Sequence, residues 1–251
     1  MNKDKLRILA AKKKVPFGII EKDYSISIIL SFISRAEFKK NLIFKGGTAL
    51  KKIYFEDYRF SEDLDFTCSE NVFAQMLNFL KTNLENKEIS EIKFKEIIVK
   101  AKNKSIYIKY EIWPGHTNSV RIDLSLREKP IRKTNSMTKN DSYGFEYEIE
   151  TLSLEEILAE KFRALIERKQ TRDLYDAWYL MSKKKVQFNL GDINKKLSIH
   201  KDKFDFEKFE NKLNDLESEW NRDLIQLLPK KDVPDFLVVK KSILEVIKEN
   251  L

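Results

Sequence analysis

One short segment constrains the fold and the chemistry of this chain more than any other. Residues 59–66 read Arg-Phe-Ser-Glu-Asp-Leu-Asp-Phe, and their alternation of apolar and polar residues predicts a β-strand. Leu64 and Phe66 are expected to face a core. The opposite face is expected to carry Arg59, Ser61, Asp63 and Asp65. Neighbouring carboxylates repel each other unless a cation lies between them, so this face predicts a divalent metal site, with a solvated strand face as the alternative.

Composition limits the class of protein. The chain has 251 residues, of which 42% are hydrophobic, enough for a packed core and too many for a disordered chain. No apolar run approaches the length that spans a bilayer, and the first residues do not resemble a signal peptide. The single cysteine, Cys68, excludes an intramolecular disulfide and a thiolate metal site. We therefore expect a cytoplasmic (cytosolic) protein with no membrane partner.

Positive charge is concentrated in the first part of the chain. Residues 1–150 contain 28 Lys and Arg against 21 Asp and Glu, whereas residues 151–251 contain 20 against 19. The excess indicates a polyanionic partner, such as nucleic acid or nucleotide phosphates. The alternative is a lysine-rich surface that serves only solubility.

The order of predicted elements indicates an α+β fold. Helices are predicted over 6–13, 21–34 and 71–84, and strands over 42–44, 92–99, 106–112 and 120–126, with turns at 102–104 and 114–118. A polar loop is predicted over 127–143 and an edge strand over 144–150. The chain after Ser153 is predicted to be helical. These patterns predict a sheet-containing domain over 1–150 and a helical domain over 151–251.

The segment Lys45-Gly46-Gly47-Thr48 joins the strand at 42–44 to a helix. Glycines let a backbone approach a ligand closely, and the start of a helix offers N–H groups to phosphate oxygens. Thr48 is predicted to be the N-cap residue of that helix. The segment therefore favours phosphate binding, although a Gly-Gly pair at this place is often only a turn.

A third carboxylate follows on a later strand. The alternation in residues 120–126 places Asp123 on the polar face beside Arg121. If this strand lies next to the Asp63 strand, three carboxylates share one surface, as two-metal phosphoryl transfer requires. The alternative is a surface aspartate that pairs with Arg121.

Charged residues in the helical part complete the pattern. Ser153 and Glu156 have the spacing of a capping box, which predicts a helix over 154–168. Lys161 lies on the apolar face of this helix, and Arg168 lies near its edge. A lysine on an apolar face either extends its ammonium to solvent or meets an anion.

The next predicted helix begins at Thr171 and contains Arg172, Asp173 and Asp176. The two aspartates are three residues apart and therefore lie side by side on its surface. Carboxylates in the first turn of a helix also serve simply as partners of its dipole.

Together these motifs resemble one known family. They are Gly46-Gly47-Thr48-Ala49-Leu50, the segment 59–66, Glu160-Lys161, the segment Arg172–Asp176 and, upstream, Glu21-Lys22-Asp23-Tyr24. In this order they resemble the AbiEii/AbiGii family of nucleotidyltransferase-like toxins from type IV abortive-infection toxin–antitoxin systems. The resemblance covers about residues 17–182.

The resemblance implies a nucleotidyltransferase-like mixed sheet of the DNA polymerase beta type with flanking helices, followed by a helical domain. It implies transfer of a nucleoside monophosphate from a nucleoside triphosphate with Mg²⁺ or Mn²⁺, with the 3′ end of tRNA as the acceptor in some relatives, and a cognate antitoxin. Carried over by position, Asp63 and Asp65 would hold metal, with Asp123 added from its strand pattern. Triphosphate binding would fall to Lys161, and Asp173 or Asp176 would complete the site. Substrate contacts are expected from Lys45, Gly46, Gly47, Thr48, Ser61, Arg168 and Arg172.

Two other functions compete with RNA modification. The same site could nucleotidylate a protein hydroxyl, or the chain could be a non-catalytic module that binds nucleotide or RNA. The basic residues Lys129, Arg132 and Lys133 of the predicted loop, with the segment 93–104, are expected to contact RNA backbone. Ser61 is expected to hydrogen-bond a carboxylate or phosphate, and its phosphorylation is a second hypothesis, because the added charge would oppose triphosphate binding.

Overall fold

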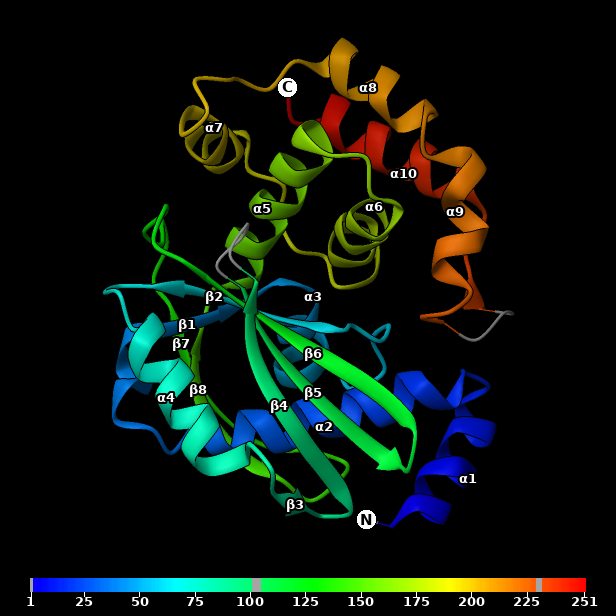
Figure 1. Ribbon diagram of the computed structural model, residues 1–251. Coiled ribbons are helices and arrows are strands. Elements are labelled where there is room, and N and C mark those ends of the chain that lie inside the picture. Colours follow the sequence, from blue (N-terminus) through cyan, green and yellow to red (C-terminus); the bar gives the residue numbers. More distant parts are fainter. Residues whose placement is uncertain (1, 101–104, 229–231) are drawn as a thin grey trace. The chain divides into compact units, whose positions relative to one another are not determined.

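The strands of the chain form one mixed sheet. The computed structural model describes residues 2–100, 105–228 and 232–251. Within these residues the sheet has eight strands in the order β3-β4-β5-β6-β2-β1-β8-β7 (Figure 1). The strands are β1 (Leu42–Lys45), β2 (Asp63–Cys68), β3 (Glu88–Ile89), β4 (Ile92–Lys100), β5 (Ser105–Trp113), β6 (His116–Ser125), β7 (Asn135–Asn140) and β8 (Glu146–Thr151).

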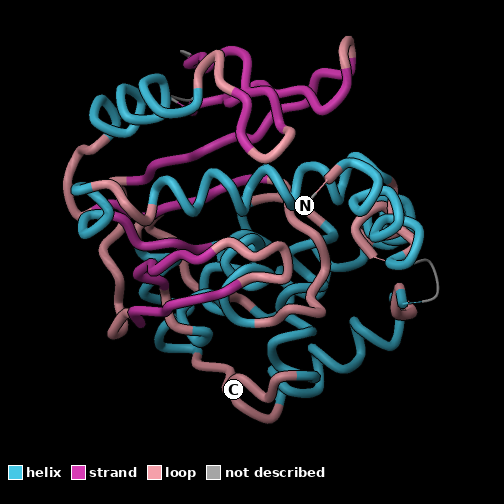
Figure 2. Tube along the Cα trace, turned by 90° about the horizontal axis from the view of Figure 1, so that it is seen from below, coloured by secondary structure: helices cyan, strands magenta, loops and turns pink. Residues whose placement is uncertain are grey.

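The chain divides into two compact units. The first comprises Met1–Lys129 and Thr134–Thr151, and the second comprises Pro130–Lys133 and Leu152–Leu251. All strands assigned in the described residues belong to the first unit, and the second unit is helical (Figure 2). The α+β fold class predicted from the sequence is therefore confirmed.

Strand β2 lies inside the sheet and has partners on both sides. It runs antiparallel to β1 and parallel to β6. Leu64 and Phe66 are fully buried, as the alternation predicts, and Phe66 stacks on Phe44 of β1 with ring centroids 5.1 Å apart. The polar face of β2 is thereby fixed on the other side of the sheet.

Helices and short helical turns surround the sheet in the first unit. They are α1 (Lys3–Lys13), α2 (Phe17–Ile33), η1 (Glu37–Asn41), α3 (Gly46–Ala49), η2 (Leu50–Tyr54) and α4 (Phe73–Leu84). The long helix α2 packs against β6 and β8, and α4 packs against β4. The Asn2 side chain accepts a hydrogen bond from the Lys5 N–H and so caps α1.

Three sequence predictions for this unit are wrong. The predicted loop over 127–143 contains strand β7, because its polar side chains alternate without a buried apolar face and so give no strand signal. Strand β8 is not at the edge, since it lies between β1 and β7. The strand predicted over 59–66 begins only at Asp63, and Arg59 is 2% exposed rather than on a polar face.

The second unit consists of helices packed around aromatic side chains. Phe162 of α5 lies 5.2 Å from Phe188 and 5.4 Å from Phe209, measured between ring centroids. The helical elements are α5 (Leu154–Glu167), α6 (Thr171–Trp178), η3 (Tyr179–Lys183), α7 (Leu190–Ser198), α8 (Phe206–Asn214), α9 (Glu217–Leu224) and α10 (Phe236–Lys248).

The predicted capping box at the start of α5 is half right. Ser153 Oγ accepts a hydrogen bond from the Glu156 N–H, as expected. The Glu156 side chain does not return to the cap. It is fully buried and instead accepts hydrogen bonds from the backbone N–H groups of Ile131 and Arg132 and from Lys196 Nζ. This carboxylate therefore fixes the segment 130–133 within the helical unit.

No helix among the described residues has both the length and the apolar character needed to cross a membrane. The turn predicted at 114–118 is shorter in the structure: Pro114 and Gly115, which has φ +80°, form it, and residues 116–118 already belong to β6. The turn predicted at 102–104 lies outside the described residues.

Helix α2 contains a fully buried carboxyl group, that of Glu21, whose charged form is unfavourable in the core. Glu21 is fully buried, and within the described chain neither of its carboxylate oxygens has a hydrogen-bond partner. Burial raises the pKa of Glu21 to about 7, although His116, with Nε2 3.6 Å from Oε2, and Lys22 act in the opposite direction. The folded protein therefore favours the protonated carboxyl group.

We expect the Glu21→Gln variant to gain stability relative to the wild type as the pH rises from 4.5 to 7. Because the charged carboxylate is disfavoured in the core, the free energy of unfolding of the wild type should fall by up to about 3 kcal/mol between these two pH values. Glutamine has the shape of the protonated acid and does not titrate. Urea unfolding at several pH values measures the difference. The exposed Glu37→Gln variant should follow the wild type, and parallel curves for Glu21→Gln would contradict the assignment.

Candidate active site

The segment after β1 leads from the sheet into a short helix. Lys45 ends β1, and Gly46 adopts φ +77°, a backbone conformation that favours glycine. Helix α3 begins at Gly46, so the predicted N-cap role of Thr48 is wrong. Thr48 lies inside the helix, and its hydroxyl donates a hydrogen bond to the Asp63 carbonyl oxygen. This bond joins the glycine segment (residues 45–48) directly to the first residue of β2.

Both glycines of this segment have close neighbours. A Cβ atom on Gly46 would lie 2.7 Å from Asp65 Oδ2. A Cβ atom on Gly47 would lie 2.8 Å from an Arg59 guanidinium nitrogen and 3.0 Å from Ser61 Oγ. The backbone of the glycine segment therefore packs against the side chains that surround the carboxylates.

The predicted meeting of the carboxylate strands is present in the sheet. Strands β2 and β6 are adjacent and parallel, and Asp65 is the register partner of Asp123. On the other side of β2, Asp65 is the register partner of Lys45. Asp63, Asp65 and Asp123 are each partly exposed. The sheet thus places the three carboxylates and the glycine segment in one region of the first unit.

Arg121 is the charged partner of this region. Its guanidinium contacts Asp63 Oδ2 at 2.8 Å and Asp123 Oδ2 at 3.2 Å. Burial lowers the pKa of Arg121, but Asp63, Asp123 and Asp65 outweigh that effect, and the pKa is raised overall. The arginine therefore neutralises part of the negative charge that gathers on this face.

The carboxylates fit a metal in their chemistry but are not arranged as a closed site. Carboxylate oxygens are the ligands that Mg²⁺ and Mn²⁺ prefer. Across the described part of the chain, however, no three His, Cys, Asp or Glu side chains are grouped so that they could hold an ion. A cation at Asp63 and Asp123 would have to replace the guanidinium of Arg121. The assignment of these residues as metal ligands stays a prediction.

The predicted residues of the helical part form a second cluster, within the second unit. Lys161 Nζ lies 2.9 Å from Asp173 Oδ1 and 2.7 Å from Asp176 Oδ2, and both aspartate side chains are fully buried. Burial raises the pKa of Asp173, but Lys161 and Arg168 more than compensate, so the pKa is lowered. Lys161 thus meets anions supplied by the protein itself.

Two arginines border this cluster. Arg168 Nε contacts Asp173 Oδ2 at 3.0 Å, although the Arg168 side chain is 56% exposed. Arg172 is half-buried at the start of α6. The sequence prediction that these charged residues gather on α5 and α6 therefore agrees with the structure, while their contact with substrate stays a prediction.

Sequence reasoning does not find the roles of two residues. The alternative interpretation of the sequence pairs Arg121 with Asp123, and this ion pair is present, but the contact of Arg121 with Asp63 on the neighbouring strand is not predicted. The pattern places Arg59 on the polar strand face, whereas its guanidinium is buried and donates a hydrogen bond to the Phe60 carbonyl oxygen. No sequence pattern distinguishes such an arginine from an exposed one, because its burial depends on the close approach of Gly47.

Comparison with known proteins identifies the family. The model of the family described as nucleotidyl transferase AbiEii toxin, type IV TA system, matches residues 28–241. The chain belongs to this family. It is accordingly a nucleotidyltransferase of the toxin class, as the sequence motifs suggest. The match extends past residue 182 and includes most of the C-terminal helices, for which the sequence motifs gave no resemblance.

Solved structures show the same fold. MenT4, a nucleotidyltransferase toxin from Mycobacterium tuberculosis H37Rv, superimposes with a TM-score of 0.72 at 16% identity, covering 98% of this chain and 88% of that one. A protein from H. pylori described as a nucleotidyltransferase gives a TM-score of 0.63 at 20% identity, covering 92% and 96%. No curated protein sequence matches the chain.

We expect Gly46→Ala to destabilise the AbiEii-family protein. The substitution forces a side chain into a positive φ and against Asp65 Oδ2, and such strain costs about 1–3 kcal/mol. Urea unfolding gives the free energy of unfolding. Gly18→Ala is the matched control, because Gly18 lies in helix α2 and a Cβ atom added there would have no other atom within 4 Å. Equal stabilities for the two variants would contradict the crowding at Gly46.

Proposed function

We propose that this protein transfers a nucleoside monophosphate from a nucleoside triphosphate to the 3′ end of tRNA and thereby inhibits growth. The observation that carries the proposal is the junction of Gly46 with Asp65. At this junction a backbone segment suited to phosphate lies against a carboxylate suited to a metal. Membership of the toxin family supports the growth-inhibiting role.

In this proposal Asp63 and Asp65 hold Mg²⁺ or Mn²⁺, with Asp123 as a further ligand. A bound divalent ion would lower the charge of the triphosphate and activate the attacking hydroxyl. Arg121 keeps the face partly neutral by pairing with Asp63 and Asp123. The glycine segment and Ser61 bind and orient phosphate oxygens, which limits the geometries that the triphosphate can adopt.

The cluster on α5 and α6 also has a proposed role. Lys161 supplies a positive charge for the triphosphate, while Asp173 and Asp176 hold its ammonium in a fixed position. Arg168 and Arg172 are proposed to contact substrate, and the exposed guanidinium of Arg168 is consistent with this. A lysine held by two buried aspartates is a strongly ordered cation, because its side chain has lost its rotational freedom.

The protein is proposed to act in the cytoplasm and to be counteracted by a cognate antitoxin, as the type IV classification of its family suggests. Protein nucleotidylation by the same site is the second candidate, and the acceptor distinguishes it from RNA modification. A non-catalytic binding role is the third.

The test uses Asp63→Asn. Wild-type protein with Mg²⁺ is expected to transfer labelled nucleotide to purified tRNA, whereas the variant should lose at least about a hundredfold in rate because the carboxylate charge is removed. Asp57→Asn, which neutralises an exposed aspartate before β2, is the control. Label on a protein pool instead would favour the second candidate. Growth inhibition that persists in Asp63→Asn would favour the third.

The basic surface near residue 130 has a narrower proposed role than the sequence suggested. Arg132 is held inside the second unit, where its Nε lies 2.6 Å from Asp192 Oδ2. Lys129 and Lys133 are exposed and able to contact RNA phosphates. The segment 93–104 lies partly outside the described residues.

We expect the double variant Lys129→Glu, Lys133→Glu to reduce transfer to RNA by about tenfold or more at low salt, because phosphate contacts are lost. The difference should shrink as salt is added, since wild-type binding weakens more steeply. Rates measured at several salt concentrations test this. Lys208→Glu, at a lysine whose side chain is 80% exposed on α8, serves as the charge-reversal control. Equal salt dependence in all three proteins would eliminate these lysines as RNA contacts.

A further inference from the structure

Two consecutive residues of helix α2 contact residues next to the glycine segment and next to β2, the two segments of the proposed nucleotide site. Lys22 Nζ lies 2.9 Å from Glu62 Oε1, in the segment before β2. Asp23 Oδ1 lies 2.8 Å from Lys52 Nζ, in the turn η2 that follows the glycine segment. Helix α2 is therefore tied by charge to both sides of the junction between Gly46 and Asp65.

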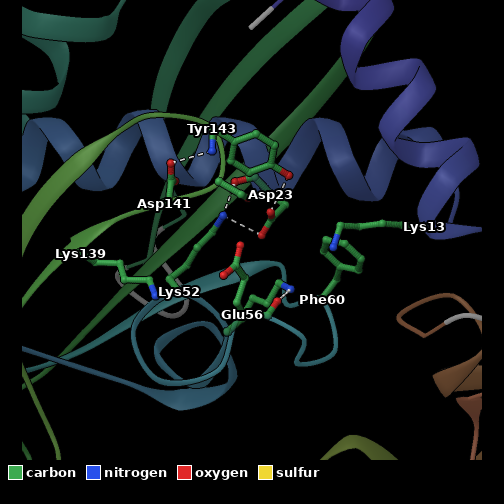
Figure 3. A pocket seen from close by; sticks show the side chains of 10 residues that line it. Lys13, Asp23, Lys52, Glu56, Phe60, Lys139, Asp141 and Tyr143 are labelled. Atoms are coloured by element: carbon green, nitrogen blue, oxygen red, sulfur yellow. Dashed lines mark hydrogen bonds and ion pairs between the residues drawn. The ribbon is translucent and has the colours of Figure 1, made fainter.

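The Lys52 ammonium is bound by α2 at three points. Besides its ion pair with Asp23, it donates hydrogen bonds to the Asp23 carbonyl oxygen at 2.9 Å and to Ser27 Oγ at 2.8 Å. The Lys52 and Asp23 side chains are only 4% and 5% exposed. The Tyr143 hydroxyl donates to Asp23 Oδ2 at 2.7 Å and so completes the network (Figure 3).

This network does not have the space of a ligand site. Figure 3 shows the Lys52–Asp23 pair beside a cavity that Lys13, Glu56 and Lys139 also line. The cavity measures about 30 Å³, room for a few water molecules and far less than the roughly 300–1,000 Å³ of a typical ligand pocket. The buried pair therefore acts through the position of the chain segments that it joins.

A buried ion pair also contributes little net stability. Removing two charges from water costs several kcal/mol, and their attraction roughly offsets this cost. Apolar residues of similar size would fill the same space without that penalty. The charged groups instead fix a position. Lys52 Nζ makes three contacts with α2, and together these contacts hold η2 at one distance from that helix.

The contact between Lys22 and Glu62 lies directly beside the proposed metal ligand Asp63 in the chain. Glu62 lies between Ser61 and Asp63, in the segment that precedes the paired residues of β2. Lys22 holds this segment at Glu62, while Arg59 of the same segment lies against Gly47. The side chain of Lys22 is 17% exposed and that of Glu62 is 36% exposed, so this pair is less buried than the first.

We propose that Lys22 and Asp23 are positioning residues of the nucleotidyltransferase site. Asp23, through Lys52, sets the glycine segment for the triphosphate, and Lys22, through Glu62, sets Asp63. The inference rests on the proposed function for its kinetic part. Lys22 and Asp23 belong to the motif Glu21–Tyr24 that resembles the family, but neither that resemblance nor the family match over residues 28–241 gives them a role.

The kinetic test measures transfer of labelled nucleotide to purified tRNA as the nucleoside triphosphate concentration is varied. Asp23→Asn should raise the KM for the nucleotide about tenfold and change kcat less, because the phosphate-binding segment is displaced. Lys22→Gln should lower kcat about tenfold and keep the KM. Lys39→Gln breaks a comparable 2.8 Å pair with Glu148 elsewhere on the unit and should retain both constants. Unchanged constants in the first two variants would overturn the inference.

A charge swap separates positioning from general destabilisation. The double variant Lys22→Glu, Glu62→Lys should recover most of the lost kcat, because the contact is restored with reversed polarity. If Asp23→Asn does not fold, Ser27→Ala and Tyr143→Phe each remove one hydrogen bond of the same network and carry the test. Failure of the swap to recover kcat would count against the role of Lys22.

Amide hydrogen exchange gives a readout that needs no activity. Asp23→Asn should speed exchange in residues 46–54, and Lys22→Gln should speed exchange in residues 59–66. If the wild-type protein transfers no nucleotide, the proposed function fails, while these local changes still support the coupling to α2. Uniformly faster exchange over the whole first unit would show a merely structural role and overturn the inference.

Discussion

The backbone pairing of strand β2 determines where Lys45, Asp63, Asp65 and Asp123 lie. One side of β2 is paired with β1 and the other with β6, so Asp65 is flanked by Lys45 and Asp123 at the same level of the sheet. A shift of one residue in either pairing would turn the carboxylates into the core and Leu64 into solvent. The buried residues of β2 therefore help to fix the register, because Phe66 stacks on Phe44, its partner in β1.

In each unit one basic side chain partly neutralises a pair of neighbouring aspartates. In the first unit an arginine stands between two aspartates, and in the second a lysine stands between two aspartates. Each cation allows acidic groups to come closer than their repulsion would otherwise permit. The difference lies in solvent access, since the Lys161 cluster is buried and the Arg121 cluster is partly exposed. An ion from solution can therefore compete with Arg121 more readily than with Lys161.

The sequence predicts the interior of this protein better than its polar contacts. Alternating apolar residues locate β2, β5 and β6, because burial imposes a period that is visible in the chain. Strand β7 is not predicted in this way, because none of its side chains is fully buried. At the candidate site, the strand pattern correctly places Asp65 and Asp123 on neighbouring strands, while the roles of the aspartates and glycines stay predictions. The contact of Arg121 with Asp63 depends on β6 lying beside β2, and the burial of Arg59 depends on the approach of Gly47, and neither is visible in a local sequence pattern.

The segment 130–133 belongs to the second unit, although it lies in the chain between two parts of the first. The backbone leaves the first unit after Lys129, returns at Thr134 and leaves again after Thr151. Glu156 holds Ile131 and Arg132 from a point more than twenty residues later. A fragment that ends at residue 151 would contain the strands assigned in the described residues but would lack the Glu156 carboxylate that accepts hydrogen bonds from these two amides. Residue 151 is therefore a poor end for a fragment, because it would separate the segment 130–133 from the Glu156 carboxylate that belongs to the same unit.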